Sequence, residues 1–403
     1  MRTALHENDG VMGSALEVLL AFLKLGLVSF GGPAAHLGYF HAEFVERRRW
    51  LDDRAYSDLV ALCQFLPGPS SSQIGIGIGL GRAGWLGSIA AWVGFTMPSA
   101  LAMIVFAYGV SRWPGLADSG AVHGLKVAAV AVVAQAVLGM GRSLCPDAPR
   151  AGIAIVGALL VLASPAETGQ VAAIVAGGVL GRWALAADPA PVPSTRARTG
   201  SRRTGALLLL AFGILLVGLW LLAAASDALA LQAFASFYRS GSLVFGGGHV
   251  VLPLLQASVV PQGWVSNDAF LAGYGAAQAV PGPLFSFSAY LGATMPSPLG
   301  GWTGGLFLLV ALFLPGFLLV TGALPFWEAL RRRTGMRQAL AGINAAVVGL
   351  LGAALYDPVW TSAIHGRADF ALALAAFGLL QFGKVSPVIV VALTAAGGWL
   401  LGA

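Results

Sequence analysis

Four breaks in strongly apolar sequence hold the residues of this chain best suited to chemistry. Two carry the phrase Phe-Gly-Gly, at 30–32 and 245–247, and two carry Pro-Gly-Pro, at 67–69 and 281–283. Each break should start a new helix, and a helix N-terminus presents free backbone N–H groups and a partial positive charge. Several such N-termini together would bind an anion, above all a tetrahedral oxyanion.

The residues predicted to bind this anion flank the four breaks. Proline suits the first turn of a helix because it has no N–H to satisfy there, and serine hydroxyls beside a break would add donors. A single break would be better interpreted as a plain kink or loop, but repetition at matched positions favours a binding site. The candidates are Gly31, Gly32, Pro33, Pro67, Gly68, Pro69, Ser70, Ser71, Ser72, Gly247, Gly248, Pro281, Gly282 and Pro283, with Ser286 and Ser288 in the corresponding region of the second half.

Two cations add to the predicted site. Lys24 and Arg239 occupy matching positions, one to two turns before the two Phe-Gly-Gly breaks. A cation buried in a membrane is costly unless it is paired or functional, which favours a role in anion binding. The equally weighted alternative is that each side chain snorkels to the membrane interface.

Polar residues near the breaks are further candidates for coupling or for lining the pocket. His36 and His249 follow the Phe-Gly-Gly breaks and could couple transport to protons, although a lone histidine is more often a packing residue. Gln64 and Gln278 precede each Pro-Gly-Pro by three residues. We expect them to satisfy carbonyls freed by the break, with a pocket-lining role as the alternative.

Four other residues receive weaker predictions. Glu43 and Glu46 lie beside an arginine run and are expected to form a solvated charge cluster, with a gate or a proton-coupling carboxylate as the alternative. Lys126 resembles the other two cations, but Asn344 stands at its repeat position. Any ligand role at Lys126 and Asn344 would therefore be unequal between the halves.

The composition explains why helix breaks matter here. Of 403 residues, 57% are hydrophobic and 10% are charged, against roughly 25% charged in a soluble domain. The chain is therefore predicted to be an integral membrane protein whose partner is the lipid bilayer. Its 55 glycines suit close helix packing and would also allow a homodimer. The net charge of +6 is ascribed to Lys and Arg in short loops, not to binding of nucleic acid.

Apolar stretches predict the helices of an all-α fold. Stretches of about 20 residues can span a bilayer, whereas those around the breaks are too short and read as half-helices paired into re-entrant hairpins. The stretches are 14–31, 33–45, 55–67, 70–83, 86–110, 121–140, 150–163, 169–187, 206–225, 231–246, 248–260, 269–281, 284–297, 301–324, 338–356, 368–383 and 386–402.

Matched landmarks divide the chain into two repeats, 1–187 and 206–403, the second with an extra leading span. The Pro-rich and then basic segment 188–205 is predicted to be a cytoplasmic linker, and the N-terminus is also predicted to be cytoplasmic. Arg47–Arg49 lie in a first-half loop whose second-half counterpart has no Lys or Arg. Conversely, Arg331–Arg333 lie in a second-half loop whose first-half counterpart, around Arg112 to Asp118, has only one Arg. This exchange of positive charge predicts two inverted-topology repeats.

An enzyme is disfavoured by the residues present. Cys63 and Cys145 make no metal-ligand spacing, and neither a metal centre nor a cofactor is predicted. Asp52, Asp53 and Asp58 have no second acidic cluster with which to hold another metal, and no HExxH, GxSxG or phosphate-loop pattern occurs.

Three features together resemble the chromate transporter family in its duplicated long-chain form, over nearly the whole chain. They are Phe30-Gly31-Gly32-Pro33, the Arg-rich loop ending in Trp50, and Gln64-Phe65-Leu66-Pro67-Gly68-Pro69-Ser70. The resemblance implies a bacterial inner-membrane protein that exports chromate and confers resistance, with sulfate as competitor and coupling to the proton-motive force. The second break reads Gly-Gly-Gly where Gly-Gly-Pro is expected, which suggests unequal half-sites. The residues alone leave sulfate, molybdate and phosphate open as substrates, and leave open a passive anion channel.

Overall fold

The computed structural model describes residues 14–112, 119–164, 166–186, 201–245, 247–331 and 333–401. Most of these residues are helical, and there is no β-strand among them. The predicted cytoplasmic N-terminal segment, most of the loop up to Asp118, and residues 188–200 of the predicted linker lie outside the described residues.

The first half forms helices whose starts are fixed by local signals. Side chains of Ser14, Asp52, Ser119 and Asp147 accept a hydrogen bond from a backbone N–H in the first turn of the helix that each precedes. The helices are α1 (Ala15–Val28), α2 (Gly32–His41) with a π-helical continuation (Ala42–Arg47), α3 (Asp53–Phe65), α4 (Ser70–Arg112), α6 (Gly120–Leu144), α7 (Ala148–Ala163) and α8 (Ala166–Ala184).

The second half repeats this order after one additional helix, α9 (Arg202–Ala224). Helices α10 to α14 correspond to α1 to α4, and α16, α18 and α19 correspond to α6, α7 and α8. The bounds are α10 (Leu229–Ser242), a 3₁₀ turn (Gly248–Val250) leading into α11 (Val251–Val259), α12 (Asn267–Ala277), a 3₁₀ turn (Leu284–Ser286) leading into α13 (Phe287–Thr294), α14 (Gly301–Ala323), α15 (Trp327–Arg331), α16 (Thr334–Ala354), α17 (Thr361–Ala363), α18 (Arg367–Gln381) and α19 (Pro387–Leu401).

The predicted breaks interrupt the helices where expected. Gly31 takes a φ of 99° and caps α2, and Pro33 stands in the first turn of that helix. Helix α4 begins at Ser70, directly after Pro69. The predicted separation of 70–83 from 86–110 is confirmed as non-helical backbone at Ala83 and Gly84 inside α4.

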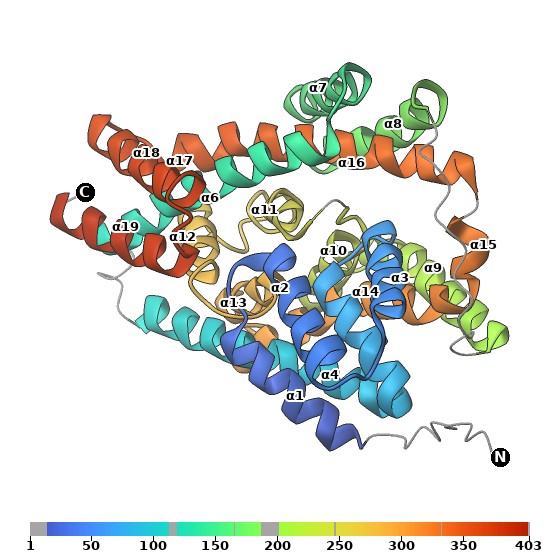
Figure 1. The fold of residues 1–403 in the computed structure, drawn as a ribbon. Helices are drawn as coiled ribbons and strands as arrows, with labels where there is room; N and C mark the ends of the chain where they lie inside the picture. The colour runs from blue at the N-terminus through green and yellow to red at the C-terminus, as the bar shows by residue number, and fades with distance from the viewer. Residues whose placement is uncertain are drawn as a thin grey trace, which may run out of the picture.

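The halves exchange their last two helices. Helices α7 and α8 pack against α16 of the second half, while α18 and α19 pack against α6 of the first. Backbones meet closely at both places: a Cβ on Gly342 would lie 2.1 Å from the Gly177 carbonyl oxygen, and one on Gly124 would lie 2.1 Å from the Thr394 carbonyl oxygen. Figure 1 shows α6 and α16 along one edge, α1 and α4 along the other, and the short helices α2, α11 and α13 between them.

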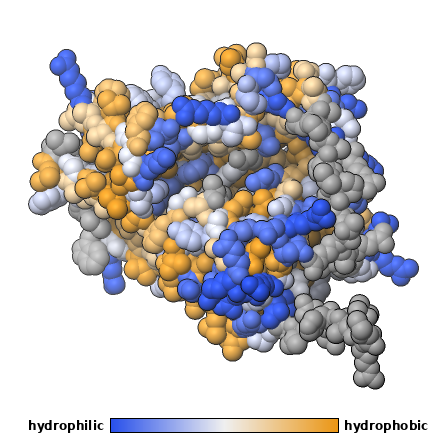
Figure 2. Space-filling model, in the orientation of Figure 1, coloured by the Kyte–Doolittle hydropathy of each residue, from blue (hydrophilic) through white to orange (hydrophobic). Residues whose placement is uncertain are grey.

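Helix lengths and surface match a membrane protein. Within the described part of the chain, five helices are long and apolar enough to cross a membrane: Ser70–Val110, Gly120–Leu144, Arg202–Ala224, Gly301–Leu330 and Thr334–Ala363. Apolar side chains form much of the outer surface in Figure 2. By contrast, α2 with 10 residues and α11 with 9 residues reach about 15 Å, half of the hydrocarbon core.

Candidate functional site

Each Pro-Gly-Pro break is held by the Phe-Gly-Gly break of the other half. The Gly68 N–H donates to the Val244 carbonyl oxygen at 2.8 Å, and the Gly282 N–H donates to the Ser29 carbonyl oxygen at 2.9 Å. Ser29 and Val244 occupy matching positions, so these two hydrogen bonds form a reciprocal pair. The four breaks predicted from the sequence therefore meet as two pairs, each containing one break from each half.

The same glycines lie against a long helix of the opposite half. A Cβ on Gly68 would lie 3.2 Å from the Gly316 Cα in α14, and one on Gly282 would lie 3.0 Å from the Ser99 Oγ in α4. Both glycines also have positive φ angles, 123° and 97°. Each break is therefore fixed to the other half by a hydrogen bond and by a contact that tolerates no side chain.

Gln73, not the predicted Gln64, satisfies a carbonyl freed at the first break. Its Nε2 donates to the Pro67 carbonyl oxygen at 2.9 Å and to the Gly316 carbonyl oxygen at 3.3 Å. Gln64 is exposed, because it faces away from the break on α3. Its repeat partner Gln278 is half-buried, and its Nε2 has no hydrogen-bond partner among the described residues.

We predict that Gln73→Leu destabilises the protein by about 1–3 kcal/mol, because two buried carbonyl oxygens lose their donor. The free energy of unfolding can be followed by thermal or denaturant unfolding of the protein in detergent. Gln64→Leu is the matched control, and its exposed side chain should leave stability within about 0.5 kcal/mol of wild type. Equal losses from both substitutions would contradict the role assigned to Gln73.

Buried hydroxyls gather near the first-half breaks. Ser71 and Ser72, in the first turn of α4, are 3% and 2% exposed, and Ser29 is fully buried. The Oγ atoms of Ser72 and Ser29 have no hydrogen-bond partner among the described residues. An unsatisfied buried hydroxyl is costly, so these two groups are available to an occupant of the site. In the second half, the Ser288 Oγ donates to its own helix, to the Phe285 carbonyl oxygen at 2.8 Å.

The two candidate histidines differ in their partners. His36 is buried and its Nε2 lies 3.2 Å from the Ser29 carbonyl oxygen, the acceptor that also binds Gly282. The His36 Nδ1 has no partner among the described residues. His249 is half-buried, and its Nδ1 lies 2.9 Å from the Tyr274 hydroxyl oxygen. His36 therefore lies directly at a paired break.

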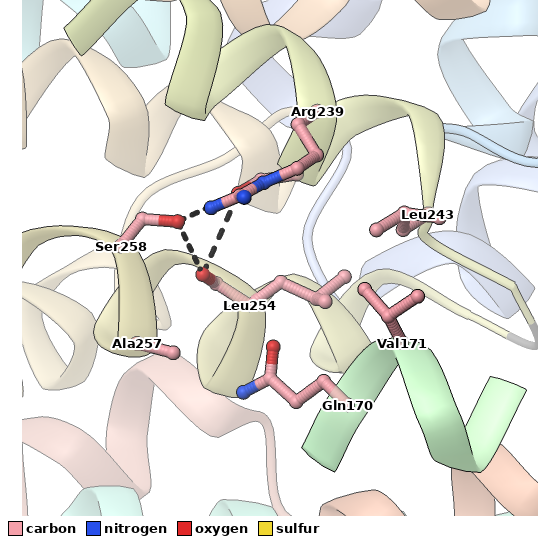
Figure 3. A pocket seen from close by; sticks show the side chains of 8 residues that line it. Gln170, Val171, Arg239, Leu243, Leu254, Ala257 and Ser258 are labelled. Atoms are coloured by element: carbon pink, nitrogen blue, oxygen red, sulfur yellow. Dashed lines mark hydrogen bonds between the residues drawn. The ribbon is translucent and has the colours of Figure 1, made fainter. Parts of the chain in front are cut away.

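Arg239 lines two adjoining cavities. The larger cavity holds about 310 Å³ and is bounded by α9, α10 and the loop that contains Gln262 and Trp264. The smaller cavity lies further along α10 toward the Gly-rich break, and Figure 3 shows Arg239, Leu254 and Ser258 around it, with Gln170 from α8. The Arg239 guanidinium therefore brings positive charge to the wall of both cavities.

Lys24 does not share the environment of Arg239. Its side chain is exposed, on the face of α1 that also carries Leu20 and Leu27, each 56% exposed. This apolar stripe identifies Lys24 as the snorkelling alternative, because the side chain extends along a lipid-type surface. Of the two equally weighted alternatives, burial is therefore wrong for Lys24 and the snorkelling position agrees with its exposure.

The remaining weak candidates lie elsewhere in the fold. Lys126 forms an ion pair with Asp268, with Nζ and Oδ1 2.9 Å apart, and so joins the start of α6 to the start of α12. Asn344 lies in α16, and its Oδ1 is buried without a partner among the described residues. The structure brings neither residue into the two cavities beside Arg239.

Glu43 is buried, so the predicted solvated cluster is wrong at this residue. Arg47 Nε and Arg48 Nε donate to its carboxylate oxygens at 2.7 Å and 2.6 Å, whereas Glu46 is exposed beside His41. Burial opposes the ionisation of Glu43, but the hydrogen bonds from both arginines hold the pKa of its carboxyl below the usual value. The charges form a connected network instead of separate solvated groups.

Trp50 joins this network to a second ion pair. The guanidinium carbons of Arg48 and Arg82 each lie 5.2 Å from its ring centroid, and Arg82 Nη2 lies 3.2 Å from a carboxylate oxygen of Glu17. We call Glu17, Glu43, Arg47, Arg48, Trp50 and Arg82 the charged cluster. Trp264, the repeat partner of Trp50, borders the open 310 Å³ cavity instead. The equivalent tryptophans therefore have different surroundings, Trp50 between two arginines and Trp264 at a cavity.

Comparisons with known proteins assign a family. The family model described as "Chromate transporter" matches residues 16–182 and again residues 231–399. A chromate transport protein of Pseudomonas aeruginosa is 30% identical over 407 residues, covering 96% of this chain and 92% of the relative. Another, of Cupriavidus metallidurans, is 27% identical, covering 93% of this chain and 90% of the relative. No solved structure matches significantly.

Proposed function

The chain belongs to the chromate transporter family, and from its geometry we propose a secondary-active exporter that works by alternating access. The substrate would be chromate, bound between two inverted repeats. The protein would lie in a bacterial inner membrane with its N-terminus and the 188–205 linker in the cytoplasm. The observation on which this rests is the reciprocal hydrogen bonding of Gly68 to Val244 and of Gly282 to Ser29.

Antiparallel packing of equivalent helices supports the inversion. Tyr108, late in α4, packs on Trp302 at the start of α14 with ring centroids 6.0 Å apart, and Trp92, earlier in α4, lies 5.7 Å from Phe313. Two helices related by the repeat therefore run in opposite directions. A two-fold axis in the membrane plane relates such repeats, with a substrate site at their interface.

The positions of helix ends support an assignment of the two sides of the membrane. The start of α9, at Gly205, packs on Gly322 and Pro325, which precede the arginine-rich loop in the sequence. The opposite end of α9, at Trp220, borders the cavity beside Trp264. Applying the positive-inside rule, we place the arginine loops and the charged cluster in the cytoplasm and the cavity on the outer side.

The oxyanion would bind at the helix starts beside the paired breaks. Each α-helix N-terminus carries roughly half a positive charge, and the two unpartnered serine hydroxyls and the His36 ring add polar groups. Breaks within short helices are tolerated at membrane depth where they line a polar cavity, as re-entrant segments do. The starts concerned are those of α2 at Gly32 and α4 at Ser70, and of the 3₁₀ turns at Gly248 and Leu284 that lead into α11 and α13.

In this proposal the structure represents a state open to the outside. Arg239 is reached from the 310 Å³ cavity, whereas the charged cluster closes the cytoplasmic end of the first repeat. When one repeat rocks against the other, the two breaks of each pair would move as one unit, because a hydrogen bond joins them across the halves. Opening to the cytoplasm would then require the charged cluster to separate.

Glu43→Gln is expected to favour cytoplasmic opening. Removing the charge weakens two partly buried ion pairs, and a loss of about 1.4 kcal/mol would raise the open population about tenfold. The reporter is buried Cys63, which packs in the same apolar cluster as Phe44, and its maleimide labelling should accelerate about tenfold in a Cys145→Ser background.

Glu46→Gln is the matched control for this experiment, because it removes an exposed carboxylate three residues away. Its labelling rate should stay within about twofold of the parent. Because the pKa of Glu43 is lowered, protonation of its carboxyl should favour cytoplasmic opening only at pH values below the ordinary glutamate pKa of 4.5. Similar acceleration by both substitutions would contradict a gate at Glu43.

Transport itself is tested with everted membrane vesicles that contain the protein. Labelled chromate should accumulate when the vesicles are energised, leak out when they are uncoupled, and accumulate less when sulfate is added. Flux that never exceeds the electrochemical gradient would indicate a channel. Absence of chromate flux, with folded and inserted protein, would exclude chromate and direct the test to sulfate, molybdate and phosphate.

A further inference from the structure

Two histidines and an aspartate meet at the end of the molecule that we place outside. His123 lies in the first turn of α6, and Asp369 lies in the first turn of α18, with His365 in the segment just before it. One ligand atom from each of the three side chains lies within 4.8 Å of the others. We call these residues the His–His–Asp cluster. It lies apart from both cavities at Arg239.

The carboxylate of Asp369 is already oriented by the backbone. Its Oδ2 accepts hydrogen bonds from the N–H groups of His365 at 2.9 Å and Gly366 at 3.1 Å. Its Oδ1 faces His123, whose Nε2 lies 2.8 Å away. Second-shell hydrogen bonds of this kind fix a ligating carboxylate, and a metal ion would take the place of the proton between its other oxygen and His123.

The position of the His365 ring is not explained by the capping of α18 or by the ion pair between His123 and Asp369. His365 stacks on His123 with ring centroids 5.7 Å apart and an interplanar angle of 28°. In the described part of the chain no hydrogen bond holds the His365 ring, so the ring is free to turn toward the other two ligands. Because His365 is exposed while the side chains of His123 and Asp369 are 12% and 10% exposed, an ion could enter from solvent beside it.

We propose that the His–His–Asp cluster binds a divalent transition-metal ion of the Zn²⁺ type. Two imidazole nitrogens and one carboxylate oxygen are ligands that zinc, cobalt and nickel accept, and water would complete the coordination. Bonds of about 2.1 Å at tetrahedral angles set ligand atoms roughly 3.4 Å apart. The wider spacings to His365 must therefore shrink, while His123 Nε2 and Asp369 Oδ1, now 2.8 Å apart, separate slightly. Turning the exposed His365 ring supplies most of this movement, with a smaller shift of His123.

The proposed site would join the two halves. His123 comes from the first repeat and the other two ligands from the second, so a bound ion would hold α6 against α18. The start of α6 is also tied to α12 through Lys126 and Asp268. Metal binding would therefore stabilise the outer end of the interface between the repeats, independently of which anion is transported.

Cobalt is a suitable probe because its visible absorption reports the ligands. Full-length protein, purified without a polyhistidine tag and stripped with a chelator, would be titrated with Co²⁺ in detergent. We expect one ion per chain, a visible ligand-field band, displacement by Zn²⁺, and a higher melting temperature with either metal. His365→Asn should weaken affinity at least about 100-fold, since loss of a second-shell partner alone costs 10- to 100-fold.

His41→Asn is the matched control, because His41 lies beside Asp53 and Glu46 but no second imidazole. Its cobalt band and metal-induced stabilisation should equal those of the parent. His123→Asn should behave like His365→Asn, and the exposed His365 variant serves alone if His123→Asn fails to fold. A titration without a cobalt band, or a band that His365→Asn leaves unchanged, would overturn the proposal.

Discussion

Gly68→Val is expected to abolish chromate transport and to destabilise the protein by about 3 kcal/mol or more. A β-branched residue at a φ of 123° is strained by roughly 1–3 kcal/mol. Its Cβ would also lie 3.2 Å from the Gly316 Cα of the opposite half, and such overpacking typically costs 1–3 kcal/mol. Relief of either strain moves the Gly68 N–H away from Val244. Chromate uptake and thermal unfolding of the purified variant measure the two effects.

Because the two hydrogen bonds between the breaks are reciprocal, the same prediction applies to Gly282. Gly282→Val should reproduce the effect, because Gly282 has a φ of 97° and contacts Ser99 and Phe95 of the first half. Gly109→Val is the control, since a Cβ at Gly109 would meet no atom within 4 Å and its φ is ordinary for a helix. Normal transport by either break variant, at normal stability, would show that the paired breaks are not the centre of the mechanism.

The helix boundaries could be predicted from the sequence because their signals are local. Gly31, Pro69 and Gly84 each interrupt a helix by their own backbone preferences, and the structure breaks at or beside each of them. The repeat was readable for the same reason, since equivalent breaks recur at matched distances. The pairing of each Pro-Gly-Pro break with a Phe-Gly-Gly break could not be predicted, because spacing along a chain does not specify contacts between halves.

The residues that sequence reasoning missed make contacts between distant parts of the chain. Gln73 donates to the carbonyl of a residue 243 positions away, and His123 lies beside a carboxylate 246 positions away. A glutamine in the first turn after Pro-Gly-Pro was the one local signal for the former. Glu43 was misassigned because a carboxylate beside three arginines looks solvated in sequence, although the π-helical turn directs it inward.

Lys24 and Arg239 also show that local sequence does not predict the surroundings that distant parts of the chain create. The two cations occupy equivalent positions, and nothing in their local sequence separates a snorkelling side chain from one that lines a cavity. The difference arises from α9, the helix that only the second half has. Its Trp220 and Ala223 help to enclose the space that Arg239 borders, while the corresponding face of α1 remains exposed. The extra helix therefore makes the surroundings of Lys24 and Arg239 unequal.

Arg239→Gln is accordingly expected to raise the KM for chromate at least tenfold, whereas Lys24→Gln should change it less than about twofold. A guanidinium about 4 Å from a unit charge near a protein surface contributes up to about 4 kcal/mol, and a tenfold change needs about 1.4 kcal/mol. Both substitutions remove one positive charge, so a general effect of net charge would appear equally in both. Arg239→Lys should recover much of the affinity if charge is what the site requires. Equal KM values for the two glutamine variants would return Lys24 to the site and remove the cavity beside α9 from the transport path.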